Sequence, residues 1–75
     1  MALDFRRATD ELLACISHQE LAEALGVSIA TVRQARLDES AKAHRRPPHG
    51  WETTVAKLAR TRAERLNRLA AKLTH

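Results

Sequence analysis

The sequence predicts an all-α fold, a compact domain of about three short helices followed by one long carboxy-terminal helix. Ser17 and Glu20 have the spacing of a capping box, in which the hydroxyl and the carboxylate each satisfy a backbone N–H where a helix begins. Gly26 follows at the distance of a helix end, where glycine adopts a left-handed conformation at little cost. Residues 51–73 carry apolar side chains at helical spacing, which predicts a helix of roughly 34 Å.

The length and the composition indicate one soluble domain, residues 1–75. A chain of 75 residues buries only a small core and gains stability from association. Its single cysteine excludes an internal disulfide, which is typical of the cytoplasm. No apolar run approaches the length of a membrane span. We therefore expect a cytoplasmic protein that does not enter a membrane.

The charge is uneven along the chain. Residues 1–30 have a net charge of −3 and residues 31–75 a net charge of +7, which together give the overall +4. A basic region of this kind favours a polyanionic partner, although a solvated arginine-rich surface gives the same composition. Phe5 and Trp51 are the only aromatic residues, whereas proteins that grip single strands stack bases on several aromatics. Duplex DNA is the favoured polyanion.

Residues 4–16 are predicted to form the first helix, with Asp4 as its cap. Phe5, Ala8, Leu12 and Ile16 share one face. Cys15 lies beside that face, and we expect it to be a small buried hydrophobe and not a nucleophile.

The next stretch, residues 17–37, predicts two short helices joined by a tight turn. The first has an apolar face and ends at Gly26. Ser28 then caps a second helix, about residues 29–37, whose inner face is Val32 and Ala35. Ile29 lies at the edge of that face. Five positions are expected to be buried: Leu21, Leu25, Val27, Val32 and Ala35.

This layout resembles the helix-turn-helix of small bacterial and phage regulators of the lambda-repressor/Cro (XRE-like) type. Ala22 is a small residue where the two helices would cross, and Gly26 follows four residues later in the turn. The resemblance implies a sequence-specific regulator that binds double-stranded DNA, as a repressor or an accessory factor associated with the nucleoid. The alternative is an ordinary corner between two helices with no nucleic-acid role.

The second helix of the motif is where base reading is expected. The resemblance places base contacts at Ser28, Ile29, Ala30, Arg33, Gln34 and Leu37. Ile29 is left out of the predicted site because it can face either side. The predicted base-reading residues are Ser28, Ala30, Thr31, Arg33 and Gln34. Arginine offers a bidentate fork to guanine, glutamine does the same for adenine, and a methyl group can lie against thymine. For Arg33 and Arg36 the alternative is a solvated helix end, where cations are favoured anyway.

A basic connector, residues 38–50, follows the motif. Asp38 or Ser40 can open a short turn of helix within 38–44, and Pro47 and Pro48 then force an extended path. Loops that follow a recognition helix commonly contact phosphates, which positions a protein without conveying sequence. The predicted backbone-contacting residues are Gln19, Arg36, Lys42, Arg45 and Arg46. A flexible polar linker is the alternative for this connector, which is longer than in compact repressors.

The long helix, residues 51–73, carries one apolar stripe on a basic background. Its first half is expected to close the domain, with Trp51 as the anchor. Its second half is longer than a three-helix core can cover, so it predicts a dimer or partner interface at Leu66, Leu69 and Leu73. Arg62 interrupts the stripe, and it is expected to be paired with a carboxylate or to reach out to water.

Together these features predict a homodimer that binds an inverted repeat, because one recognition helix gives little specificity and a two-fold pair is the commonest assembly. An alternative is a helix-turn-helix-shaped antiactivator that docks on a transcription factor. The segment PPHGWE and the Arg/Ala-rich helix resemble such small regulators from mobile conjugative elements and phages. An enzyme is disfavoured, since there is no phosphate-cradling glycine-rich loop and no room for a sizeable pocket. We expect no metal, cofactor or small-molecule ligand.

Overall fold

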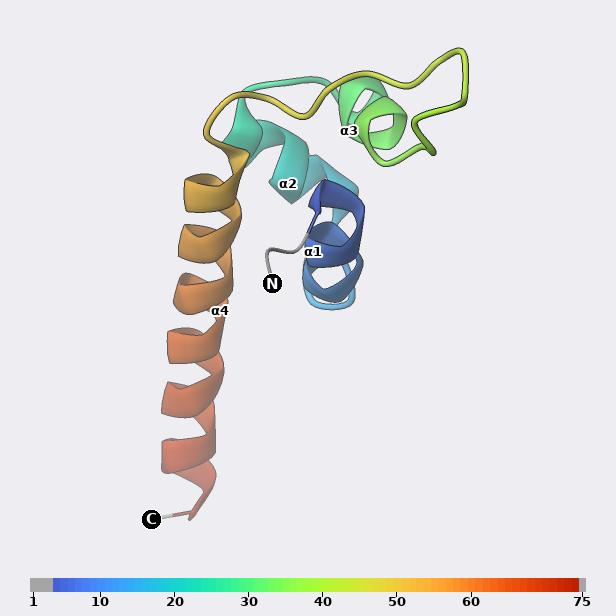
Figure 1. The fold of residues 1–75 in the computed structure, drawn as a ribbon. Coiled ribbons are helices and arrows are strands. Elements are labelled where there is room, and N and C mark those ends of the chain that lie inside the picture. Colours follow the sequence, from blue (N-terminus) through green and yellow to red (C-terminus); the bar gives the residue numbers. More distant parts are fainter. Residues whose placement is uncertain (1–3, 75) are drawn as a thin grey trace.

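The computed structural model describes residues 4–74 and contains four helices within them: α1 (Phe5–Leu12), α2 (His18–Leu25), α3 (Ile29–Ala35) and α4 (Trp51–Thr74). The predicted all-α fold of three short helices and one long carboxy-terminal helix is confirmed. The three short helices form one cluster, and α4 runs beside it and continues well past it (Figure 1). The molecule is therefore elongated, with extents of 52 × 28 × 19 Å.

Each short helix begins at the residue whose side chain was predicted to cap it. Asp4 Oδ1 accepts a hydrogen bond from the Arg7 backbone N–H at 2.8 Å. Ser17 Oγ accepts one from the Glu20 N–H at 3.1 Å, and Glu20 Oε1 accepts one from the Ser17 N–H at 3.4 Å, which completes the capping box. Ser28 caps α3 in the same way. These bonds satisfy backbone donors that a helix start leaves without a partner.

The first helix is shorter than predicted, which corrects the expected range of 4–16. It ends at Leu12, and the chain continues in a turn in which the Cys15 N–H donates to the Leu12 carbonyl at 2.9 Å. This turn keeps Ile16 in the core and directs Cys15 outward, so the prediction of a buried Cys15 is wrong. After this turn the chain reaches Ser17, which adopts the extended conformation of the residue that caps α2.

The connector between α3 and α4 contains hydrogen-bonded turns in place of the short helical turn considered for 38–44. α3 ends at Ala35, before the expected residue 37. Asp38 Oδ1 accepts from both the N–H and the hydroxyl of Ser40, at 2.9 and 2.7 Å. Such local bonds from a side chain to the nearby backbone compete with helix formation. Residues 44–48 then run without regular secondary structure, as the two prolines favour.

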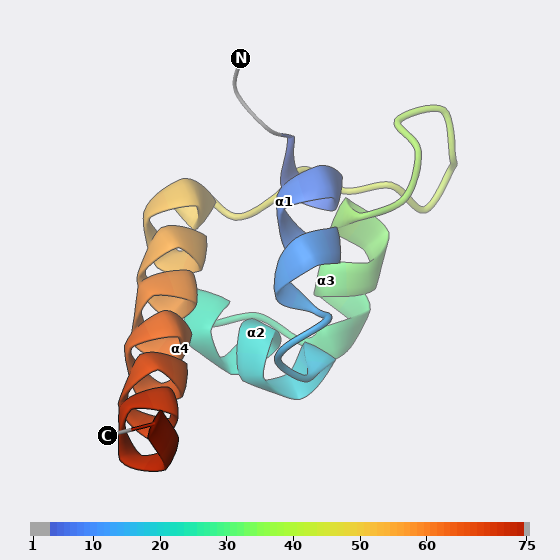
Figure 2. The same ribbon diagram turned by 90° about the horizontal axis from the view of Figure 1, so that it is seen from below.

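The core lies where the short helices meet the first half of α4. Leu21 and Val32 are fully buried, and they are joined by six apolar side chains that are nearly so: Phe5, Leu12, Ile16, Ala22, Ala35 and Val55. Leu25 and Val27, both predicted to be buried, are half-buried and pack against this cluster. The view along α4 shows α1 lying between α4 and α3 (Figure 2). Thr9 is also fully buried, and its hydroxyl donates to the Phe5 carbonyl at 2.7 Å.

The first half of α4 closes the domain as predicted. Trp51 meets Phe5 edge to face, with ring centroids 5.2 Å apart. Arg62 Nη2 donates to Glu20 Oε2 at 3.0 Å, which confirms that this arginine is paired. Past this ion pair α4 leaves the body of the protein, and Leu66, Leu69 and Leu73 are 51%, 52% and 74% exposed.

None of the helices between residues 4 and 74 has both the length and the apolar character needed to cross a bilayer.

Candidate nucleic-acid interface

The turn between α2 and α3 fixes the orientation of the predicted recognition helix. Gly26 has φ +72°, a left-handed conformation that ends α2. The following residue, Val27, donates its N–H to the Ala22 carbonyl at 3.0 Å, so the turn is tied back to the helix it leaves. Val32 and Ala35 then anchor α3 in the core. The opposite face of α3 is consequently turned away from the body of the protein.

The residues predicted to read bases differ in how far they are exposed. Ala30 and Arg33 are exposed on α3, and Thr31 and Gln34 are half-buried. Ser28 is exposed at the start of the helix. Its Oγ accepts from the Thr31 N–H at 3.1 Å and lies 2.9 Å from Thr31 Oγ1, so these two hydroxyls already bond to one another. Arg33 therefore presents the largest exposed hydrogen-bonding group among the five.

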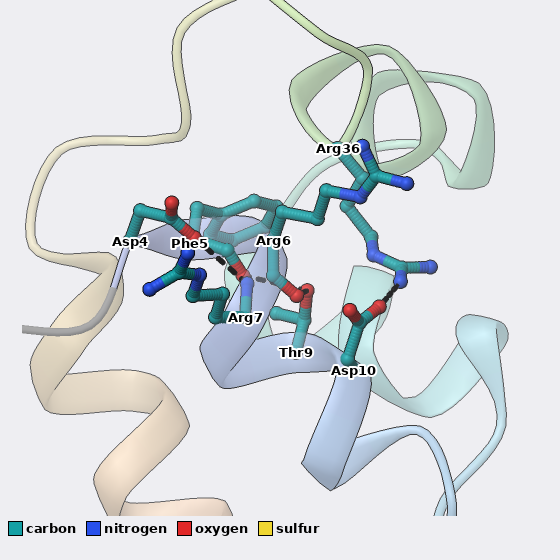
Figure 3. A network of polar contacts seen from close by, with 7 residues as sticks. All are labelled: Asp4, Phe5, Arg6, Arg7, Thr9, Asp10 and Arg36. Atoms are coloured by element: carbon teal, nitrogen blue, oxygen red, sulfur yellow. Dashed lines mark hydrogen bonds and ion pairs between the residues drawn. The ribbon is translucent and has the colours of Figure 1, made fainter.

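Arg36, predicted to contact the DNA backbone, lies in an ion pair with Asp10 of α1 (Figure 3). Its side chain is only 22% exposed, and its buried Nε atom has no hydrogen-bond partner. The pair joins α1 to the residue that caps the carboxy end of α3. Arg36 thus helps to hold α3 in place, and a phosphate contact at this residue stays a prediction.

Arg6 is a cationic neighbour of this region that the sequence analysis missed. Its side chain extends from α1 toward the carboxy end of α3, beside Arg36 (Figure 3). It lies in the same hollow as Arg46, but three aspartates and Glu39 also line that hollow, which makes its charge mixed. No local pattern in the sequence indicates this arrangement, because residue 6 lies far from α3 along the chain.

The other predicted backbone-contacting residues are found on the surface. Lys42, Arg45 and Arg46 are exposed on the connector, which extends past α3 on the side away from α4 (Figures 1 and 2). The Arg45 N–H donates to the Gln34 carbonyl at 3.2 Å, so the middle of this basic loop is held against α3. Gln19 is exposed in the first turn of α2, where its Nε2 donates to Glu23 at 3.1 Å.

Asp38 adds a fixed negative charge at the start of the basic connector. The backbone N–H and the hydroxyl of Ser40 hold the pKa of Asp38 below its ordinary value of 3.8, and Arg6 and His44 lower this pKa further. The carboxylate is therefore ionised at neutral pH. It offsets part of the positive charge that Lys42, Arg45 and Arg46 contribute.

No protein-family model matches the chain, and comparisons with curated proteins and with solved structures gave no significant similarity. Among residues 4–74 there is no group of three or more histidine, cysteine, aspartate or glutamate side chains placed to hold a metal ion.

Proposed function

We propose that the protein is a sequence-specific regulator of transcription that binds double-stranded DNA as a homodimer on an inverted repeat. The observation that carries this proposal is the exposed Arg33 on α3. That helix is held from behind by the buried Val32 and Ala35 and from the side by the Arg36–Asp10 ion pair. A rigid helix with an exposed polar face is what insertion into a major groove requires.

In this proposal the side chains of α3 read base edges. The Arg33 guanidinium donates two parallel hydrogen bonds to guanine O6 and N7, which is the commonest specific contact in the major groove. Gln34 bonds to an adjacent adenine, and Ala30 lies against a thymine methyl group. The hydroxyl groups of Ser28 and Thr31 share one hydrogen bond at the start of the helix. The hydroxyl that accepts this bond keeps its own proton, which it can donate to a base or a phosphate.

The connector supplies the contacts that do not depend on sequence. Lys42, Arg45 and Arg46 bind phosphates beside the groove that α3 enters, and the bond from Arg45 to Gln34 keeps the loop close to that helix. Each phosphate neutralised releases counterions, so affinity falls as the salt concentration rises.

Two copies are needed because one short helix distinguishes too few base pairs among the competing sites of a genome. A two-fold dimer doubles the number of bases read and matches an inverted repeat. With no ligand or catalytic module assigned, regulation would follow from occupancy of a promoter, as a repressor or an accessory factor.

Selection of bound duplexes from a random pool tests this proposal directly. A palindromic consensus is the expected result. Arg33→Ala should then weaken binding to the selected site by about 1–3 kcal/mol and relax the preference at one base pair of each half-site. Lys57→Ala is the matched control, since it removes the same charge from an exposed position on α4 that lies outside both α3 and the leucine stripe. Equal affinities for the two variants would contradict the placement of the reading face.

A second candidate function is favoured by the three exposed leucines of α4. Docking of this stripe on a transcription factor would make the protein an antiactivator that acts without DNA. Retention on heparin and a salt-dependent shift of random duplex DNA separate the two candidates. A protein-binding module would show neither beyond the effect of its net charge of +4.

A further inference from the structure

We propose that a second copy of the chain covers the exposed leucines of α4, with the two α4 helices packed antiparallel and each leucine stripe seated in a groove of the other copy. The stripe consists of Leu66, Leu69 and Leu73, and the groove lies between α1 and α4. This inference rests on the homodimer of the proposed function and does not depend on DNA reading.

The groove is apolar and open, with a volume of about 340 Å³. α1 contributes Ala8, Glu11 and Leu12, and the turn after α1 contributes Cys15. On α4 the lining includes Val55, Arg62 and Leu66 and the small residues Ala56, Ala59 and Ala63. Small side chains at these positions leave room that no other part of the described chain fills. Leu66 also lines the groove, so the groove is continuous with the stripe.

The stripe supplies the large side chains that the groove lacks. Its three leucines are at least half exposed, whereas a small soluble protein seldom leaves such a run uncovered. The exposed apolar stripe in the second half of α4 therefore carries three leucines, whereas the α4 residues that line the groove include Ala56, Ala59 and Ala63. A partner whose own α4 has the same layout in the opposite direction matches both halves at once.

The register of this pairing follows from the helix repeat. When the two-fold axis passes near Glu64, Leu69 of one copy lies opposite Ala59 of the other, because both are five residues from that point. Leu73 then lies opposite Val55 and Ala56. The interface is self-complementary, as a two-fold contact requires. Each copy buries its stripe and has its groove filled.

Charge favours the same arrangement over a parallel one. The second half of α4 carries Arg65 and Arg68. The groove is lined by Glu11 and by Arg62, and the charge of Arg62 is offset by its ion pair with Glu20. Antiparallel packing brings this basic half against the groove of the other copy, which Glu11 lines. Parallel packing would place the two basic halves side by side and leave both grooves empty.

Disulfide trapping tests the geometry in full-length protein. The variant carries Cys15→Ala, Ala8→Cys and Leu73→Cys. Ala8 and Val55 line the same groove, and residue 73 lies roughly 27 Å further along α4 than residue 55. Because a disulfide needs Cα atoms within about 7 Å, these cysteines cannot join inside one copy. Mild oxidation should therefore give a covalent dimer on a non-reducing gel.

Two control variants identify the bond. Cys15→Ala with Leu73→Cys alone should stay monomeric on the gel, and so should Cys15→Ala with Ala8→Cys alone. A dimer formed by the Leu73→Cys control would show parallel packing and overturn the inference. Absence of a covalent dimer from the double-cysteine variant would overturn it too.

Sedimentation equilibrium gives a measurement that needs no oxidation. Leu69→Asp should raise the dimer Kd about tenfold or more, because it places a charge where a buried leucine is expected. Ala71→Asp, on the opposite side of α4, adds the same charge and should leave the Kd unchanged. Equal Kd values for the two variants would contradict the interface. If the antiparallel dimer is trapped but the protein selects no duplex sequence, the proposed function is contradicted and the dimer inference stands.

Discussion

At the scale of single residues, Gly26 sets the angle at which α3 leaves α2. Its φ of +72° is a conformation that other residues adopt only at a cost of about 1–2 kcal/mol. A Cβ added at this position would meet no atom within 4 Å. Backbone strain is therefore the only penalty that a side chain brings here.

We predict that Gly26→Ala lowers the free energy of unfolding by about 1 kcal/mol, as measured by chemical denaturation. Gly26→Asn should lose less, because asparagine tolerates the left-handed region better than alanine does. An alanine variant as stable as the parent would show that the turn relaxes to a negative φ.

The lowered pKa of Asp38 has a definite consequence in acid. A carboxyl group whose folded pKa lies below its unfolded value stabilises the folded state above the unfolded pKa, and this contribution is lost as the pH falls through the folded pKa. The window here thus begins near pH 3.8 and extends below it. Ser40→Ala removes the hydroxyl donor and should raise the pKa of Asp38 toward 3.8, as followed by NMR titration of the carboxyl carbon. An unchanged pKa would leave the backbone N–H as the main cause.

The capping residues, Gly26 and the buried Leu21, Val32 and Ala35 could be predicted from the sequence, because their signals lie within a few residues of one another. Leu25 and Val27 were also predicted to be buried, but they are half-buried. Cys15 was misplaced because its neighbour Ile16 competes for the same core position and the early end of α1 decides between them. The ion pair of Arg36 with Asp10 joins residues that are distant in sequence, so no local pattern predicts it. The predicted base-reading residues share one surface of the structure only in part, since Thr31 and Gln34 are half-buried.

At the scale of elements, Glu20 joins two helices through one carboxylate. Oε1 closes the capping box of α2, and Oε2 accepts from Arg62 of α4. Both partners are partly exposed, with side chains 51% and 26% accessible, so the ion pair is screened by solvent. The cap is the stronger of the two interactions because it satisfies a backbone donor directly.

We accordingly predict that Ser17→Ala costs about 1 kcal/mol of stability and that Glu20→Gln costs less. The glutamine keeps an oxygen that can accept from the Ser17 N–H and loses only the charge that faces Arg62. Thermal or urea unfolding of the two variants gives the comparison. A larger loss for Glu20→Gln would mean that the contact between α2 and α4 outweighs the helix cap.

At the scale of the whole molecule, a small core is combined with a helix that extends far past it. The proposed dimer links folding to association, so the midpoint of thermal unfolding should rise with protein concentration. Replacement of Leu66, Leu69 and Leu73 by serine should abolish this dependence and leave the monomer folded, because these leucines lie outside the core. Calorimetry at two concentrations separates the outcomes. A parent protein whose midpoint is independent of concentration would contradict the dimer.

The edge-to-face contact between Trp51 and Phe5 gives the molecule an intrinsic optical reporter. Trp51 is the sole tryptophan, and it lies where α4 joins the domain, outside the groove and the leucine stripe. Its emission should shift to the red when α4 separates from α1 during denaturation and should stay constant when two copies combine. Fluorescence can therefore follow the packing of α4 against α1 within each protomer without interference from dimerisation.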